Sequence, residues 1–199
     1  MASVIEHRAN YCGPVAEEYE ARRASQPQWQ AEHAAVRELL APLRGTAGTV
    51  LDIPVGTGRF LPIYQEFGLT PLGMDVSRDM LRIAGDRGFP VFPGDILSIP
   101  IVGERHFSAA VCVRLLNWLH ADEVAQALSE LARVTAGPII AGIRLLRPGA
   151  APPRRKIIVH SQDVFDVALA AAGLKVARAI EVNANDSTVY SIHELRHVD

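Results

Sequence analysis

Short apolar runs alternate with helix-like patterns along most of the chain, from about residue 48 onward. The runs that have the composition of strands are GTVLDIP (48–54), TPLGMDV (70–76), FPVF (89–92), FSAAVCV (107–113) and GPIIAGIRLL (137–146). Between them, apolar residues recur every three or four positions, which predicts helices. This alternation is typical of a parallel sheet with crossover helices, so we expect an α/β fold with helices on both faces of the sheet.

The two ends of the chain have different patterns. Before residue 48 the pattern is helical: Pro14 can begin a helix through AEEYEARR, and the next helix has one apolar face, formed by Trp29, His33, Val36 and Leu40. At the other end, LKVARAIEV and STVYSIHELRHV flank the turn-rich NAND and predict an antiparallel hairpin. We expect a single domain over 1–199, with a helical segment over 1–47 and an α/β core over 48–199.

Composition narrows the classes of function. Hydrophobic residues make up 49% of the chain and charged residues 21%, as in an ordinary globular protein. The formal net charge of -2 argues against nucleic acid or an anionic membrane as partner. No apolar run is long enough to span a bilayer, and charges interrupt the first residues, where a signal peptide needs an apolar core. Cys12 and Cys112 are the only cysteines and show no metal-ligand spacing, so we expect no metal site and a cytoplasmic protein.

The stretch VLDIPVGTGRF (50–60) combines an acid with a glycine turn. Asp52 ends an apolar run, and Gly56 and Gly58 follow closely. In open parallel sheets, ligands bind beyond the carboxyl ends of the strands. Glycines there allow the backbone to approach a ligand closely, although a glycine pair alone also suits a purely structural turn.

Two further acids follow the next two strand-like runs. Asp75 ends the second run, where a carboxylate can accept hydrogen bonds from both hydroxyls of a ribose. Asp95 follows the third run in PGDILSIP. Each acid also has a local alternative, because Asp75 can cap the helix that begins at Ser77 and Asp95 can stabilise a turn. Three acids at three successive strand ends beside one glycine turn favour a nucleotide-like ligand.

These motifs resemble those of class I S-adenosylmethionine-dependent methyltransferases, and the resemblance covers the chain from about residue 48 to the end. VLDIPVGTGRF looks like the first motif of that family, GMDVSRDML like its ribose site, GDILSIP like its adenine site and FSAAVCVRLLNWL like its fourth strand. The resemblance implies a three-layer fold with a seven-stranded sheet in the order 3-2-1-4-5-7-6. It also implies S-adenosyl-L-methionine as cofactor, S-adenosyl-L-homocysteine as product, and a cofactor site formed by Asp52, Val55, Gly56, Thr57, Gly58, Asp75, Val76, Asp95, Ile96, Val113 and Arg114.

The first motif departs from the family pattern at Pro54, which replaces a glycine. Proline fixes its backbone angle and lacks an N–H donor, so an inactive homologue stays open as an alternative. A nicotinamide dehydrogenase is the rival among nucleotide-binding folds. Its fingerprint requires a third glycine where this chain has Leu61, which argues against it.

The methyl acceptor is less legible than the cofactor. Candidate acceptor-binding residues, each with an alternative role in packing, capping or a solvated loop, are Tyr11, Tyr19, Asn117, Trp118, Arg155 and His160. The basic loop over 147–156 suggests an anionic acceptor. No residue is assigned as a catalytic base.

We expect a methyltransferase that acts on oxygen or nitrogen of a small metabolite, as a monomer or homodimer. An RNA or protein methyltransferase of the same fold is one alternative. An inactive, cofactor-binding scaffold is the other. The sequence VRLLNWL (113–119) lacks the N-P-P-Y-type tetrapeptide with which some methyltransferases recognise a base amine.

Overall fold

The computed structural model describes residues 11–153 and 157–198, and it contains one seven-stranded sheet. The strand order is β3-β2-β1-β4-β5-β7-β6, as predicted. The strands are β1 (Thr49–Asp52), β2 (Thr70–Asp75), β3 (Val91–Pro93), β4 (Ala109–Cys112), β5 (Ile139–Leu146), β6 (Leu174–Ala184) and β7 (Thr188–His197). β1 to β5 pair in parallel, whereas β7 lies antiparallel to both β5 and β6. The predicted C-terminal hairpin is therefore confirmed.

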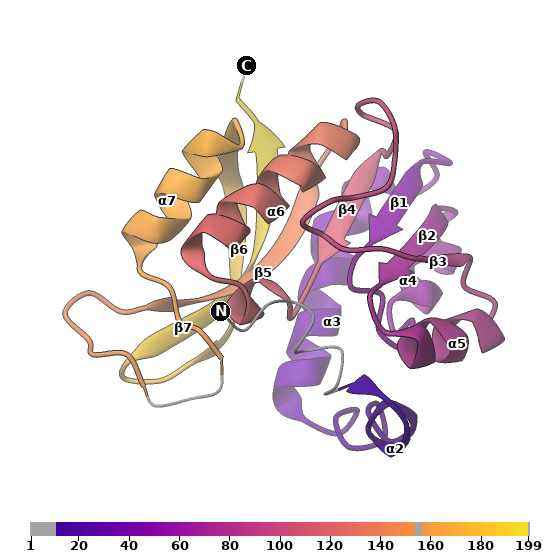
Figure 1. Ribbon diagram of the computed structural model, residues 1–199, viewed down its shortest axis with the longest axis horizontal. Coiled ribbons are helices and arrows are strands. Elements are labelled where there is room, and N and C mark those ends of the chain that lie inside the picture. Colours follow the sequence, from indigo (N-terminus) through magenta and orange to yellow (C-terminus); the bar gives the residue numbers. More distant parts are fainter. Residues whose placement is uncertain (1–10, 154–156, 199) are drawn as a thin grey trace.

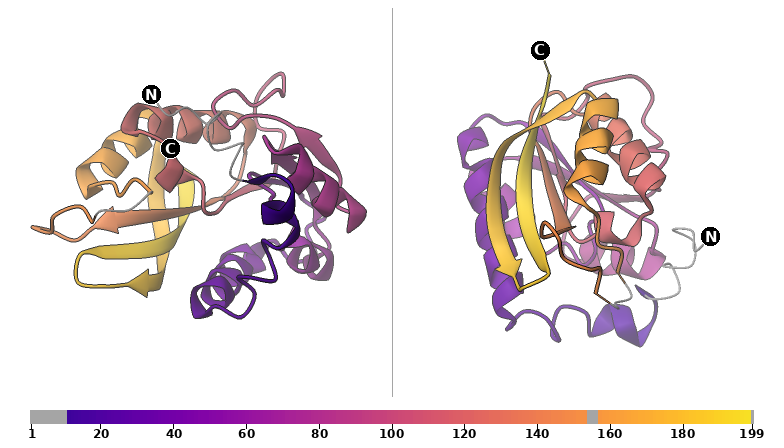
Figure 2. Two further views of the ribbon diagram at one scale, coloured as in Figure 1. Left: turned by 60° about the horizontal axis from the view of Figure 1, so that its bottom comes forward. Right: turned by 90° about the vertical axis from the view of Figure 1, so that its left-hand side faces the viewer.

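Helices cover both faces of the sheet, which confirms the three-layer arrangement (Figures 1 and 2). The α-helices are α2 (Pro14–Glu17), α3 (Pro27–Leu40), α4 (Leu61–Phe67), α5 (Arg78–Asp86), α6 (Ala121–Val134) and α7 (Gln162–Ala171). The buried side chains of α6 and α7 belong to one core, and those of α3 and α4 to the other. Among the described residues, every helix is too short or too polar to cross a bilayer.

The central strand β4 shows why an uninterrupted apolar run was needed. Ala110 and Cys112 are buried in the core under α6 and α7, whereas Ala109 and Val111 are buried in the opposite core. Side chains alternate between the two faces of a strand, so a strand covered on both faces must be apolar at every position.

The helical pattern differs from the prediction in two places. The helix that begins at Pro14 ends at Glu17 instead of continuing through AEEYEARR. The following residues turn toward the glycine loop, where Glu20 accepts a hydrogen bond from Thr57 and pairs with Arg87. Tertiary contacts therefore override local helix propensity here. The pattern after β4 divides into a short 3-10 helix, η3 (Leu116–Trp118), and α6, which begins after the N-cap residue His120.

The edge strand β6 is long and irregular. Its pairing with β7 shifts register between Val176 and Arg178 and again between Glu181 and Asn183. Most of its residues are exposed. A register shift of this kind is a β-bulge, which bends the strand and raises its local twist.

Candidate cofactor and acceptor site

The glycine turn follows β1 and passes over the carboxyl ends of β2 and β4. Pro54 lacks an N–H group, but its neighbours use theirs: Ile53 donates to the Val111 oxygen and Val55 to the Met74 oxygen, both at 2.9 Å. The N–H groups on both sides of the proline are therefore used within the sheet and turn. Gly56 (φ 54°) and Gly58 (φ 78°) then adopt left-handed backbone angles that favour glycine.

Asp75 fastens this turn to the end of β2. Its Oδ2 accepts a hydrogen bond from the Gly56 N–H at 3.0 Å, and its Oδ1 accepts one from the Ser77 N–H at 2.8 Å. The side chain is buried, which raises the pKa of the carboxyl group, while the backbone N–H groups oppose that rise. Ser77 in turn caps α5, as the sequence predicted, and its hydroxyl donates to the Tyr11 carbonyl at 2.7 Å.

Asp52 lies beneath the turn and does not line the cavity described below. Its side chain is 2% exposed, and its Oδ2 accepts a hydrogen bond from the Tyr64 hydroxyl at 3.0 Å. Burial raises the pKa of Asp52 to about 8. This acid therefore holds a proton near neutral pH and joins β1 to α4.

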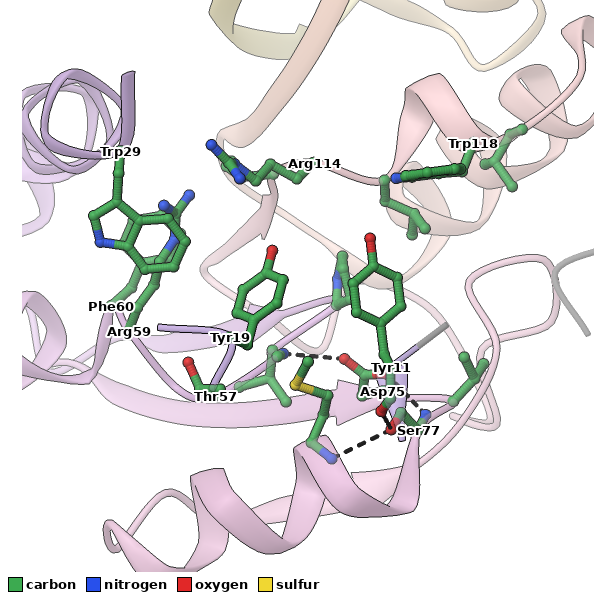
Figure 3. Close-up of a pocket in the computed structure, with 18 residues that line it drawn as sticks. Tyr11, Tyr19, Trp29, Thr57, Arg59, Phe60, Asp75, Ser77, Arg114 and Trp118 are labelled. Carbon is green, nitrogen blue, oxygen red and sulfur yellow. Dashed lines mark hydrogen bonds between the residues drawn. The ribbon is translucent and has the colours of Figure 1, made fainter. Parts of the chain in front are cut away.

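A cavity of about 100 Å³ lies above the glycine turn and Asp75. Tyr11 and Tyr19 of the N-terminal segment close it: their rings stand between Asp75 and Arg114 in Figure 3, with centroids 5.7 Å apart. Burial raises the pKa of Tyr11 to about 12, so its hydroxyl keeps its proton. Ligand pockets usually measure roughly 300–1,000 Å³. The cavity is therefore smaller than the usual space for a nucleotide-sized ligand.

A buried ion cluster forms one wall of the cavity. The carboxylate of Glu32 on α3 is fully buried and pairs with Arg59 at 2.7 Å and with Arg114 at 2.9 Å. The Arg59 guanidinium lies 4.0 Å from the centroid of the Trp29 ring and 4.3 Å from that of Phe60, which suits cation–π attraction. The Nη1 atom of Arg59 is buried and has no partner among the described residues. The cluster thus offers an unused donor beside the glycine turn.

A second cavity, of about 290 Å³, adjoins the first. The residues that line both cavities are Tyr11, Tyr19, Arg114 and Trp118. The residues that line only the second are Arg23, Gln26, Gln28, Asn117, Arg144, Ile157 and Tyr190. The shared residues therefore form the boundary between a space that contains the glycine turn and a space that does not.

The structure brings most of the predicted cofactor residues together, but not all of them. The first cavity is lined by Val55, Gly56, Thr57, Asp75, Val76, Val113 and Arg114. Gly58, Asp95 and Ile96 do not line it. A Cβ atom at Gly58 would lie 3.2 Å from Phe89, so this glycine serves close packing. Asp95 accepts a hydrogen bond from the Leu97 N–H at 3.0 Å, which matches the turn alternative, and Ile96 belongs to the core.

The predicted acceptor residues separate in the same way. Tyr11, Tyr19 and Trp118 line both cavities. Asn117 lines the second, but its side chain bonds to the Arg144 N–H at 2.7 Å and to two carbonyl groups, so it fastens η3 to β5. His160 is buried, contacts the Leu116 carbonyl at 3.2 Å and lines neither cavity. Arg155 and its basic neighbours lie outside the described residues.

Sequence reasoning missed the ion cluster. Glu32 lies on the predicted apolar face of its helix, three positions after Trp29, where a charge has no place unless it is paired. Arg59 follows directly on the glycine turn. The positions of Glu32 and Arg59 are unusual in the sequence, but nothing in the sequence shows that the two side chains form an ion pair.

Comparison with known proteins finds matches over part of the chain. A family model described as a methyltransferase domain matches residues 50–137. An uncharacterized methyltransferase of Alkaliphilus oremlandii (strain OhILAs) is 33% identical over 86 residues, which span 42% of this chain and 39% of that protein. The chain therefore matches well under half of this relative's length.

Solved structures share the fold over more of the chain. A magnesium protoporphyrin IX methyltransferase from Synechocystis PCC 6803 with bound SAH superposes with a TM-score of 0.77 at 15% identity, covering 98% of this chain and 100% of that one. The cyclase SpnF superposes with a TM-score of 0.71 at 18% identity, covering 85% of this chain and 82% of that one. The chain thus has the Rossmann-like fold of these structures, and over residues 50–137 it matches a methyltransferase domain.

Proposed function

We propose that this protein transfers a methyl group from S-adenosylmethionine to an oxygen or nitrogen atom of a small, anionic metabolite. The observation that carries the proposal is the pair of adjoining cavities, one beside the glycine turn and Asp75 and the other free of both. A cofactor and an acceptor in these two spaces would meet at Tyr11, Tyr19, Arg114 and Trp118.

The residues of the first cavity fit the cofactor. Both Asp75 oxygens are held by backbone N–H groups and keep further lone pairs for the ribose hydroxyls. Gly56 has open space where a side chain would stand, so the backbone there can approach the amino-acid end of the cofactor. The unused Nη1 donor of Arg59 suits a carboxylate group.

The cofactor supplies a methyl group on a positively charged sulfur, which leaves as a neutral thioether when the lone pair of the acceptor forms a bond to the methyl carbon. The protein's own part is to hold the acceptor atom in line and to exclude water. Tyr11 and Tyr19 form the roof that excludes water. An acceptor that is already ionised needs no general base. Among the described residues lining the two cavities, Asp75 is the one aspartate, glutamate or histidine, and backbone N–H groups hold both of its oxygens.

Calorimetry with S-adenosylhomocysteine tests cofactor binding. We expect binding to the native protein, and for Asp75→Asn a dissociation constant roughly tenfold to a hundredfold higher, since hydrogen bonds to a charged group are worth about 1.5–3 kcal/mol. Asp95→Asn is the matched control, because Asp95 lies at a neighbouring strand end but outside the cavity. No binding to the native protein would refute the proposal.

A turnover screen then separates the alternatives. One of the solved relatives is a cyclase, so the shared fold alone does not establish methyl transfer. Release of S-adenosylhomocysteine should be measured with small anions, their neutral analogues, RNA and protein extracts as acceptors. Product only with RNA or protein would favour an RNA or protein methyltransferase of the same fold, and cofactor binding without product would favour an inactive scaffold.

A further inference from the structure

The second cavity has a strongly basic lining. Three of the residues that line it are arginines, Arg23, Arg114 and Arg144, and among the described lining residues there is no aspartate or glutamate. The other described lining residues are aromatic, amide-bearing or aliphatic. The charged side chains among the described lining residues are therefore all positive.

The positive charge is only partly balanced nearby. Arg114 shares the single carboxylate of Glu32 with Arg59, so two guanidinium groups face one acid. Arg23 forms no ion pair within the described part of the chain. Its Nη1 donates to the Tyr19 carbonyl at 3.3 Å, and its guanidinium lies 3.9 Å from the centroid of the Tyr19 ring. Arg23 is therefore held beside the cavity without a carboxylate partner among the described residues, and Arg114 is held there by a carboxylate that it shares.

A buried hydroxyl group adds a neutral donor. Tyr190 on β7 lines the cavity, is 3% exposed, and its hydroxyl faces the backbone of Arg114 without a hydrogen bond of normal geometry to any described residue. Gly142 on β5 makes room for it, because a Cβ atom there would lie 2.4 Å from the hydroxyl oxygen. A buried hydroxyl left without a partner costs free energy, so a ligand that accepts a hydrogen bond from it is favoured.

We propose that this second cavity anchors a carboxylate or phosphate group of the methyl acceptor through Arg23, Arg114 and Tyr190. The acceptor's body is small and flat, because the remaining wall is built from the rings of Tyr11, Tyr19 and Trp118 and the space measures about 290 Å³. The proposal rests on the proposed function and deepens it: the arginine-lined cavity, at the far side of the shared wall from the glycine turn, selects the substrate by charge.

Calorimetry on the full chain in the presence of S-adenosylhomocysteine tests this proposal with three probes of one shape. These are para-hydroxybenzoate, phenyl phosphate and the neutral para-hydroxybenzamide. We expect at least one anion to bind tenfold or more tightly than the amide, and the stronger of the two identifies the group as carboxylate or phosphate. Equal binding of all three probes, or binding of none, would overturn the proposal, while S-adenosylhomocysteine binding in the same titration would still support the proposed function.

Two variants separate a binding role from a structural one. Arg23→Gln should weaken binding of the preferred anion at least tenfold, whereas Arg22→Gln, whose side chain is 64% exposed and pairs with Glu18, should leave it unchanged. Tyr190→Phe removes a hydroxyl that forms no hydrogen bond of normal geometry with the described residues, so thermal stability should be retained while the anion binds more weakly. The proposal is wrong if both arginine variants behave alike or if Tyr190→Phe binds the anion as well as the native chain does.

Discussion

The buried cluster of Glu32, Arg59 and Arg114 gives the sharpest test of what holds the N-terminal helix on the site. In Glu32→Gln the side chain keeps its shape and can still accept hydrogen bonds, but two guanidinium groups lose their only shared acid. The Arg59 side chain is 9% exposed and that of Arg114 22%, so water can compensate for little of this loss. Removing one partner from a buried ion pair costs about 3–5 kcal/mol. We take the lower end, about 3 kcal/mol, because the amide retains part of the hydrogen bonding.

For a chain of this length, about 3 kcal/mol lowers the midpoint of thermal unfolding by roughly 6–12 °C. Glu38→Gln is the matched control, because Glu38 lies on the same helix and pairs with Arg178 while both side chains are at least half exposed. An exposed pair of this kind is worth less than about 1 kcal/mol. Circular dichroism at low and high salt measures both variants, and salt should affect the exposed pair more than the buried cluster. If Glu32→Gln unfolds within about 2 °C of Glu38→Gln, the reasoning about the cluster is refuted.

Three further predictions concern stability. Burial raises the pKa of Asp52 to about 8, far above its value near 3.9 in an unfolded chain, so between these pH values the native state holds a proton that the unfolded state releases, and stability falls as pH rises. Asp52→Asn should therefore gain stability relative to the native protein from pH 5 to pH 8, and a constant difference between their melting temperatures would contradict this. Gly137→Ala places a Cβ atom 2.1 Å from a backbone oxygen beside β4 and should cost at least about 1–3 kcal/mol in a urea titration, whereas Gly85→Ala, with its nearest neighbour at 3.6 Å, should be neutral or stabilising. Ser77→Ala should cost about 1 kcal/mol as a lost helix cap and should also increase proteolysis of the N-terminal segment, because the Ser77 hydroxyl donates to the Tyr11 carbonyl. Ser161→Ala should lose only its cap, so equal proteolysis of the two variants would contradict a role for the Ser77–Tyr11 contact.

The sequence predicted contacts between residues that lie at the carboxyl ends of neighbouring strands. Asp75 and Gly56 meet because the carboxyl ends of neighbouring parallel strands lie together, and this follows from strand order alone. The strand order itself came from the family resemblance, not from periodicity, since apolar runs show where strands are but not which ones pair.

The rest depended on contacts between distant segments. The role of Asp52 depends on Tyr64, which packing of α4 brings beneath the turn. The Glu32 cluster joins α3, the glycine turn and the end of β4, and spacing within one segment gives no sign of such a meeting. Asp95 stays a predicted cofactor residue, because an aspartate that stabilises a turn has the same sequence pattern as one that faces a ligand.

The ends of the sheet also limit how copies of this chain can associate. At one edge, β3 has only three residues and ends in Pro93, which has no N–H group to offer another strand. At the other, β6 is long, but its two register shifts break the regular row of free backbone groups, and Lys175, Arg178 and Glu181 place charges along it. Neither edge suits the addition of a further strand, so the sheet is protected against edge-to-edge aggregation, and a homodimer would have to form through helices or loops.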